Sequence, residues 1–209
     1  MIIDLFADIA CPWCYIGEKR LVQALAQRPD LRAEVHWRPF QLQPGLPKPG
    51  EPWAEFMESK FGGARRAEMA FEHVRQAAEP EGIEFRFDRM TVAPNTEDAH
   101  RLVLFAAEKG REREVVTALF RAHFTEGRNV GDLNTLAEIA VGEGLDPDEV
   151  RAYLESEQGT GEVQASQAAA AQLGIGGVPF FVFDGRYAVS GAQPPEVFLE
   201  ALDRAAQAA

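Results

Sequence analysis

The stretch IACPWCYIG carries the only two cysteines of the 209-residue chain, Cys11 and Cys14. This CxxC spacing serves two kinds of chemistry in proteins, thiol–disulfide exchange and metal binding. The same spacing also allows a structural disulfide, or two buried cysteines that act only as small apolar side chains. The rest of the sequence discriminates among these four interpretations.

A metal centre at the pair would lack the further ligands that it needs. A closed zinc site uses four protein ligands, mostly cysteine and histidine. The chain has no second CxxC pair, and its four histidines are isolated, without an H-x₃₋₅-H pairing. We therefore expect no metal at Cys11 and Cys14.

A structural disulfide is also disfavoured. The N-terminal stretch MIIDLFADIACPW has no basic region, and Asp4 and Asp8 interrupt its apolar residues. It is unlike a secretory signal peptide, so we expect a cytoplasmic protein. Thiols are normally kept reduced in the cytoplasm, and a disulfide that closes so short a loop would contribute little stability.

The elements around the pair give the two sulfurs different settings. Residues 2–7 are apolar, as in a buried strand, and residues 11–26 have helical spacing, with Pro12 suited to the first helical turn. Cys11 then lies where the helix begins, and the unpaired N–H groups and the positive dipole end there favour its thiolate. Cys14 lies about one turn further on the same face. We expect Cys11 to be more exposed and Cys14 more buried, which is typical of a reactive pair.

The order of the remaining elements predicts the fold class. Residues 31–42 have the pattern of a second strand, which would complete a right-handed βαβ unit. A Pro/Gly-rich connector at residues 44–50 leads into segments with helical spacing, interrupted by residues 83–90, whose alternation predicts an extended segment. This helical region ends at Gly174, a natural stop.

Strand chemistry returns after Gly174. Two short apolar segments flank Asp184-Gly185, which is a hairpin turn signal, and Pro194 and Pro195 open a final helix. The order βαβ, helices, ββα predicts an α/β protein in which a helical insertion separates the halves of a mixed sheet. The predicted domains are residues 1–45 with 174–209 for the sheet and 46–173 for the inserted helices.

Charge and hydropathy exclude other classes of function. The chain has 21 basic and 33 acidic residues, a formal net charge of −12, which would repel the phosphates of nucleic acids. It contains no apolar run of about 18 residues, so no membrane span is expected.

Several motifs together resemble a known family. The CxxC pair at the start of the first helix, Val178-Pro179 before an apolar strand and the large helical insertion resemble the DsbA branch of the thioredoxin superfamily. The stretches DIACPWCYIG, PNT with the following AH, and GGVP are similar to FrnE-type DsbA-like proteins. Those are relatives of 2-hydroxychromene-2-carboxylate isomerase and the kappa-class glutathione transferases.

The resemblance implies a thioredoxin fold and a role for Val178 and Pro179. Pro179 is implied to be cis and to lie against the cysteines, while the backbone of Val178 would pair with a substrate peptide or with glutathione. The residue pattern alone favours an ordinary trans proline at the start of an edge strand.

Two departures within the active-site motif separate this chain from its relatives. The isomerase and kappa-class proteins usually have serine where Cys11 stands, so the presence of both cysteines favours dithiol–disulfide exchange. DsbA itself has histidine between its cysteines, whereas here Pro12-Trp13 fills that place. An indole cannot supply the charge of an imidazolium, so the strongly oxidising potential of DsbA is not transferred.

Weaker candidates lie outside the motif. Asn95 and His100 match the family stretch and could face the cleft, although Asn95 or Thr96 is also a natural helix cap on which His100 would pack. Gly191, Ala192 and Gln193 precede the final helix, and their N–H groups could bind a carboxylate of glutathione or could simply form a turn.

The leading hypothesis is a reductase or isomerase of protein disulfides, with Cys11 as nucleophile and Cys14 as resolving thiol. We expect no tightly bound cofactor, glutathione as a co-substrate, and protein thiols or disulfides as partners; the kappa-class relatives suggest a homodimer. The alternatives are a glutathione-dependent isomerase or transferase of a small aromatic substrate, and a chaperone-like binding protein in which the cysteines are incidental.

Overall fold

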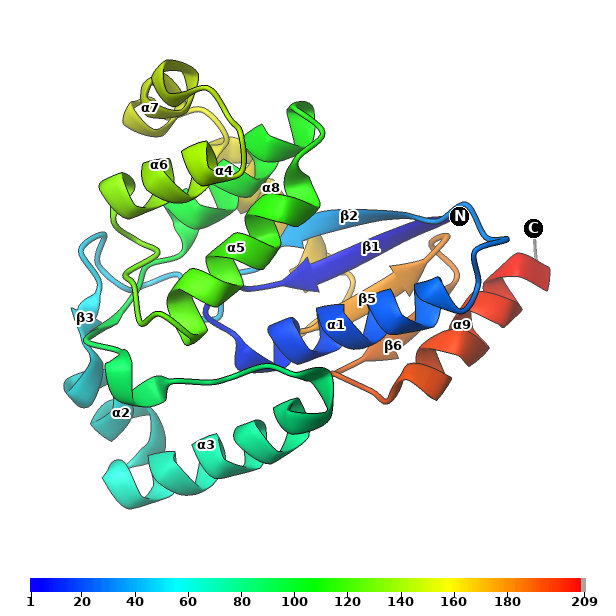
Figure 1. The fold of residues 1–209 in the computed structure, drawn as a ribbon, viewed down its shortest axis with the longest axis horizontal. Coiled ribbons are helices and arrows are strands. Elements are labelled where there is room, and N and C mark those ends of the chain that lie inside the picture. The colour runs from blue at the N-terminus through cyan, green and yellow to red at the C-terminus, as the bar shows by residue number, and fades with distance from the viewer. Residues whose placement is uncertain (208–209) are drawn as a thin grey trace. The chain divides into compact units, whose positions relative to one another are not determined.

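The computed structural model describes residues 1–207, and the chain divides into two compact units (Figure 1). The sheet unit is Met1–Leu42 together with the chain from Ala165 onward, and the helical unit is residues 43–164. The boundaries predicted after residues 45 and 173 thus fall after residues 42 and 164. The second boundary differs because Ala170 is fully buried in a cluster with Phe6 and Phe40, so the end of that helix belongs to the sheet unit.

Four strands form the sheet in the order β2-β1-β5-β6. β1 pairs in parallel with β2, whereas β5 runs antiparallel to both of its neighbours. α1 connects the two parallel strands, as the predicted βαβ unit requires. The elements of this unit are β1 (Ile2–Ala7), α1 (Pro12–Ala26), β2 (Glu34–Pro39), the second half of α8 (Thr160–Gln172), β5 (Phe180–Phe183), β6 (Tyr187–Ser190) and α9 (Pro195–Gln207).

Different helices cover the two faces of the sheet. Phe181 meets Phe198 of α9 with ring centroids 4.7 Å apart, and α1 and α9 lie side by side over this face (Figure 1). Phe180 and its register partner Phe6 point to the other side, where they pack with Ala170 of α8. The sheet is therefore buried on both faces, which explains the nearly continuous apolar runs of β1 and β5.

The predicted hairpin joins β5 to β6. Asp184 and Gly185 have φ angles of +48° and +66°, as the two central residues of a type I′ turn require, and Arg186 completes the three-residue loop. The turn is also tied to the start of β1, because the N–H of Ile2 donates to Asp184 Oδ1 at 2.6 Å. The left-handed backbone of Asp184 and Gly185, which Asp tolerates and Gly adopts freely, explains why this turn could be predicted from two residues.

The helical unit contains six whole helices, the first half of α8 and one very short strand pair among its described residues. Two of its helices begin with an aspartate cap. The Asp132 carboxylate accepts the N–H of Thr135 at 2.8 Å, and Asp146 accepts two N–H groups at 3.0 Å. In the described part of the chain, no helix is both long and apolar enough to cross a membrane. The elements are β3 (Glu51–Pro52), α2 (Trp53–Phe61), α3 (Ala64–Ala78), β4 (Val92–Ala93), α4 (Glu97–Glu108), α5 (Glu112–Phe124), α6 (Leu133–Gly142) and α7 (Pro147–Glu155), with 3₁₀ turns at Glu79–Glu81 and Phe87–Arg89.

The extended segment predicted at residues 83–90 is wrong. This stretch is irregular and ends in the 3₁₀ turn Phe87–Arg89. Phe85 and Phe87 are both buried and stack on each other at 5.3 Å between ring centroids, and Phe124 meets Phe85 edge-on at 5.1 Å. The alternation therefore reflects an aromatic cluster rather than the pairing of a strand.

A buried arginine joins α4 to the end of α7. The side chain of Arg101 is 4% exposed, and its guanidinium donates to Asp98 Oδ1 at 2.7 Å. Asp98 also accepts from Lys48 at 3.1 Å. Because the last carbonyls of a helix have no partner within the helix, a buried cation there satisfies them. Arg101 donates to the carbonyls of Tyr153 (2.9 Å), Leu154 (3.3 Å), Ser156 (2.5 Å) and Gln158 (2.6 Å).

Candidate active site

The cysteine pair opens α1. Cys11 is the N-cap residue, with an extended backbone, and Pro12 follows at the first helical position. The carbonyl of Cys11 accepts the N–H groups of Cys14 at 3.0 Å and Tyr15 at 3.4 Å, which are the first bonds of the helix. The proline has no N–H to leave unpaired there, and its fixed φ suits the first turn. The predicted position of Cys11 at a helix N-terminus is confirmed.

Both cysteines are free thiols, and both are buried. Cys11 is 4% exposed and Cys14 is fully buried. Cys14 is the deeper of the two, as predicted, but Cys11 is buried as well. The reason is a contact from a distant segment, because Cys11 Sγ donates to the carbonyl oxygen of Val178 at 3.6 Å. No local pattern in the first helix could have revealed that contact.

The surroundings of Cys14 disfavour its thiolate. Burial is the largest cause that raises the pKa of the Cys14 thiol well above its ordinary value. The hydrogen bond to Cys11 and the negative charges of Cys11 and Asp8 raise the pKa further, against a hydrogen bond from the backbone of Asp8 that lowers it. Cys14 is thus held as a thiol at neutral pH.

The Val178–Pro179 peptide bond is cis, and Pro179 lies against α1. The contact is possible because residue 17 is glycine: a Cβ there would lie 3.0 Å from Pro179 Cγ and 3.1 Å from Phe181 Cζ. Gly17 ends the IACPWCYIG motif, and this role of the residue could not be predicted from its sequence neighbours. Its small size is what lets the helix that carries the cysteines approach Pro179.

The structure also brings the loop before α9 to this place. Pro179 accepts the N–H of Gly191 at 2.9 Å, and Arg20 of α1 donates to the carbonyl of Ala192 at 2.7 Å. The N–H of Gln193 bonds to Gly191 O at 2.9 Å, and its side chain to Ser190 O at 2.9 Å. Two N–H groups offered for a carboxylate are thus bonded within the protein, which favours a simple turn at Gly191, Ala192 and Gln193.

Comparison with known proteins gives the family. The DSBA-like thioredoxin domain matches residues 2–203. The chain belongs to this family. The crystal structure of a probable DsbA oxidoreductase from Streptomyces coelicolor is 41% identical, with 99% of this chain and 90% of that chain covered and a TM-score of 0.91. The DsbA-like thioredoxin fold predicted from the sequence is confirmed.

Two more distant structures share the fold. The isomerase named in the sequence resemblance, 2-hydroxychromene-2-carboxylate isomerase, is 16% identical, with 99% of this chain and 97% of that one covered and a TM-score of 0.73. The cytosolic disulfide reductase DsbM from Pseudomonas aeruginosa, solved with GSH, is 22% identical, with 99% and 100% covered and a TM-score of 0.68. At these identities the likeness establishes the fold alone.

Asn95 and His100 belong to the helical unit of this DsbA-like chain. Asn95 is buried, donates to Leu46 O at 2.7 Å, and accepts the N–H of Glu97 at 2.9 Å. It therefore supports the start of α4, whereas the side chain of the N-cap residue Thr96 makes no cap bond. His100 is fully buried on α4. Pro12 and Trp13 are half-buried beside the cysteines.

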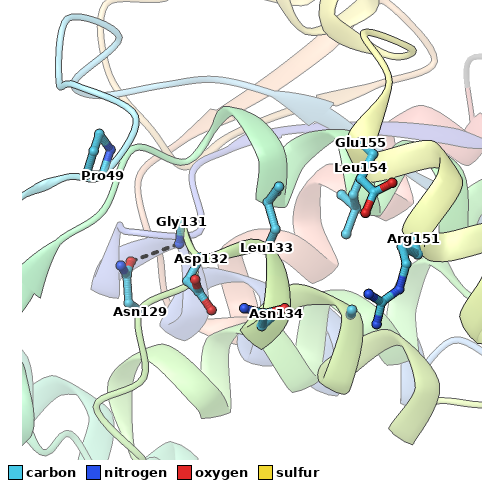
Figure 2. Close-up of a pocket in the computed structure, with 10 residues that line it drawn as sticks. Pro49, Asn129, Gly131, Asp132, Leu133, Asn134, Arg151, Leu154 and Glu155 are labelled. Carbon is cyan, nitrogen blue, oxygen red and sulfur yellow. Dashed lines mark hydrogen bonds between the residues drawn. The ribbon is translucent and has the colours of Figure 1, made fainter.

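The helical unit contains a pocket between the start of α6 and the end of α7 (Figure 2). Its volume is about 480 Å³, and it contains none of the residues predicted as site residues. Beside the pocket, Asn129 Oδ1 accepts the N–H of Gly131 at 3.0 Å. Among the described residues, no group of three or more His, Cys, Asp or Glu side chains is placed to hold a metal.

Proposed function

We propose that the chain is a thiol–disulfide oxidoreductase that reduces or isomerises protein disulfides, with Cys11 as nucleophile and Cys14 as resolving thiol. One observation carries the proposal: two free thiols in unequal settings stand at the start of α1, and Cys11 Sγ lies 3.6 Å from Val178 O beside the cis Pro179. The family match and the 41% identical Streptomyces coelicolor structure support it.

The reaction has two exchange steps. The Cys11 thiolate attacks one sulfur of the substrate disulfide, whose S–S bond breaks and releases one substrate thiolate, leaving a mixed disulfide on Cys11. The Cys14 thiolate then attacks Cys11 Sγ, which releases the second substrate thiolate and leaves a Cys11–Cys14 disulfide. The cysteine pair loses two electrons and two protons, and the substrate disulfide gains them.

Val178 and Pro179 form the substrate-binding part of this proposal. In the dithiol state the thiol of Cys11 donates a hydrogen bond to the carbonyl oxygen of Val178. When Cys11 becomes a thiolate it can no longer donate, so the carbonyl is free to accept an N–H of an extended substrate chain. Main-chain hydrogen bonds of this kind bind peptides with little regard to sequence.

Turnover of insulin tests the assignment. The protein should reduce insulin disulfides in the presence of a thiol donor, and Cys11→Ser should abolish the reaction. Circular dichroism of the variant serves as the folding control. Full activity of a folded Cys11→Ser variant would refute the assigned nucleophile.

Glutathione in a reducing cytoplasm is the proposed source of electrons. Two glutathione molecules would reduce the Cys11–Cys14 disulfide and leave as glutathione disulfide, which balances the cycle. The fold likeness to a cytosolic reductase solved with GSH supports this choice. The decisive measurement is the potential of the Cys11–Cys14 couple in glutathione buffers, where about 30 mV corresponds to a tenfold change in the equilibrium constant. A couple that stays oxidised in a cytoplasm-like buffer would exclude the reductase direction.

The second candidate is a glutathione-dependent isomerase or transferase of a small aromatic substrate. The shared fold of 2-hydroxychromene-2-carboxylate isomerase favours keeping it. Cys11 would hold the glutathione thiolate, and no resolving thiol would be needed. Turnover that survives Cys14→Ala, together with saturable glutathione binding, would favour this candidate over dithiol exchange.

A further inference from the structure

The pocket between α6 and α7 has the size of a small-molecule site. Its volume of about 480 Å³ falls within the range of about 300–1,000 Å³ that such sites occupy. Its lining residues run from Pro49 to Glu155, so the pocket belongs entirely to the helical unit. The proposed dithiol exchange uses the cysteine pair of the sheet unit and gives this pocket no role. The chemistry of its own lining therefore indicates which ligand it fits.

Opposite charges stand on the α7 side of the pocket without pairing. Arg151 and Glu155 line it from positions one helical turn apart, and both residues are exposed. Residues at this spacing can form an ion pair, although the order Arg before Glu is the weaker of the two. Among residues 1–207, neither Arg151 nor Glu155 forms an ion pair or a side-chain hydrogen bond. Figure 2 shows the guanidinium of Arg151 pointing toward the side of Asn134, so both charges are available to a ligand.

The α6 side of the pocket offers amide groups and apolar surface. Asn129 Oδ1 accepts the N–H of Gly131, and the amide nitrogen of Asn129 has no partner among the described residues. The side chain of Asn134 likewise makes no hydrogen bond in the described part of the chain. In the same lining Leu133 is 39% exposed, whereas Leu154 of α7 is 4% exposed. An apolar group of a ligand would cover Leu133, and the amides would bind its polar atoms.

The charges of the lining select a ligand that carries both signs. An anion alone would be repelled by Asp132 and Glu155, and a cation alone would be repelled by Arg151. An α-amino acid carries its ammonium and its carboxylate on one carbon, so it can reach two side chains that lie one helical turn apart. An apolar side chain on that carbon would then contact Leu133. A zwitterion with an apolar side chain therefore matches the cation, the anions and the exposed leucine together.

We propose that the pocket between α6 and α7 binds a free α-amino acid with an apolar side chain. Arg151 pairs with the carboxylate of the amino acid, Glu155 pairs with its ammonium, and Leu133 covers its side chain. Binding involves no covalent step and is independent of the proposed dithiol exchange. A peptide separates its two terminal charges and cannot make the same pair of contacts, so the site selects the free amino acid.

Isothermal titration calorimetry of the full chain with L-leucine tests the proposal. Binding should saturate with one leucine per chain at concentrations up to about 10 mM. Isoamylamine lacks the carboxylate of leucine and 4-methylpentanoate lacks its ammonium, so each should bind at least about tenfold more weakly. Absence of saturable binding of leucine would overturn the site. Equal affinity for either analogue would overturn the recognition of both charges.

Two variants locate the binding in this pocket. Arg151→Gln and Glu155→Gln each remove one charge and keep a side chain of similar size, so each should weaken leucine binding about tenfold. The matched controls are Arg113→Gln on α5 and Glu162→Gln on α8, which are exposed and lie outside the lining, and both should bind leucine as the parent does. If Arg151→Gln and Glu155→Gln bind leucine as tightly as these controls, the assignment of the pocket is incorrect.

Nuclear magnetic resonance gives an independent position for the ligand. In ¹H–¹⁵N spectra, leucine should shift the side-chain amide signals of Asn129 and Asn134, because both line the pocket. The same shifts should be absent with Arg151→Gln at the same leucine concentration. Shifts confined to residues outside the lining would contradict the proposed site even if calorimetry shows binding.

Discussion

Asp8 in the sheet unit and Arg101 in the helical unit are both buried charged side chains that are bonded to main-chain groups, and they have different effects. In the sheet unit, Asp8 accepts N–H groups from Ala10 and Leu42. In the helical unit, Arg101 donates to four carbonyls at and beyond the end of α7 and to the carboxylate of Asp98. Both side chains are almost out of contact with water.

The difference lies in what surrounds each charge. The guanidinium of Arg101 is bonded to main-chain carbonyls and to the carboxylate of Asp98, so its effect is confined to holding α4 and α7 together. The carboxylate of Asp8 instead holds the turn that leads into the cysteine pair at the start of α1.

The largest expected effect is that of Arg101→Met on stability. The change leaves four carbonyls without the donor that Arg101 supplies, and only Lys48 remains to pair with the buried Asp98, so the free energy of unfolding should fall by about 3–5 kcal/mol. Urea denaturation measures it.

Arg113→Met is the matched control for that prediction. Arg113 is exposed on α5, and its replacement should change the free energy of unfolding by no more than about 0.5 kcal/mol. If Arg101→Met costs no more than the control, the assigned structural role of Arg101 is incorrect and the comparison fails.

A smaller effect is expected from Gly17→Ala in the sheet unit. The new Cβ would press on Pro179 and Phe181, at 3.0 and 3.1 Å, and overpacking of this kind costs about 1–3 kcal/mol. Insulin reduction should fall as well, because Pro179 must shift. Gly142→Ala in α6, where nothing lies within 4 Å, is the control and should be neutral or slightly stabilising. Unchanged activity of Gly17→Ala would show that the contact between α1 and Pro179 does not matter for the site.

The smallest effect is a pH dependence of stability. Because the folded protein raises the pKa of Cys14, this thiol contributes stability that is fully present below its unfolded pKa of about 8.5 and is lost as pH rises toward the folded value. Between those two values the loss should reach about 1.4 kcal/mol per pH unit. Unfolding of Cys11→Ser is compared with Cys11→Ser/Cys14→Ala from pH 7 to alkaline pH, and parallel curves would refute the effect.

Local features of the fold and of the site could be predicted from the sequence. Pro12 fixes the start of α1, Asp132 and Asp146 cap their helices, and Asp184 with Gly185 forms the hairpin turn. Each depends on interactions within a few residues: a restricted φ, a side-chain bond to a nearby N–H, or a left-handed backbone. The unequal depth of Cys11 and Cys14 follows in the same way from one helical turn.

Only the tertiary structure decided the contacts between segments that are distant in the sequence. Val178 lies on Cys11 and removes its exposure, Gly17 admits Pro179, and Leu42 binds a carboxylate 34 residues before it. The aromatic cluster around Phe85 likewise replaced an extended segment. Such contacts depend on how packed elements fill space around one another, which periodicity and propensity do not encode. The sequence by itself determined that a cysteine pair opens a helix, and the packing around that helix decided which neighbours contact each thiol.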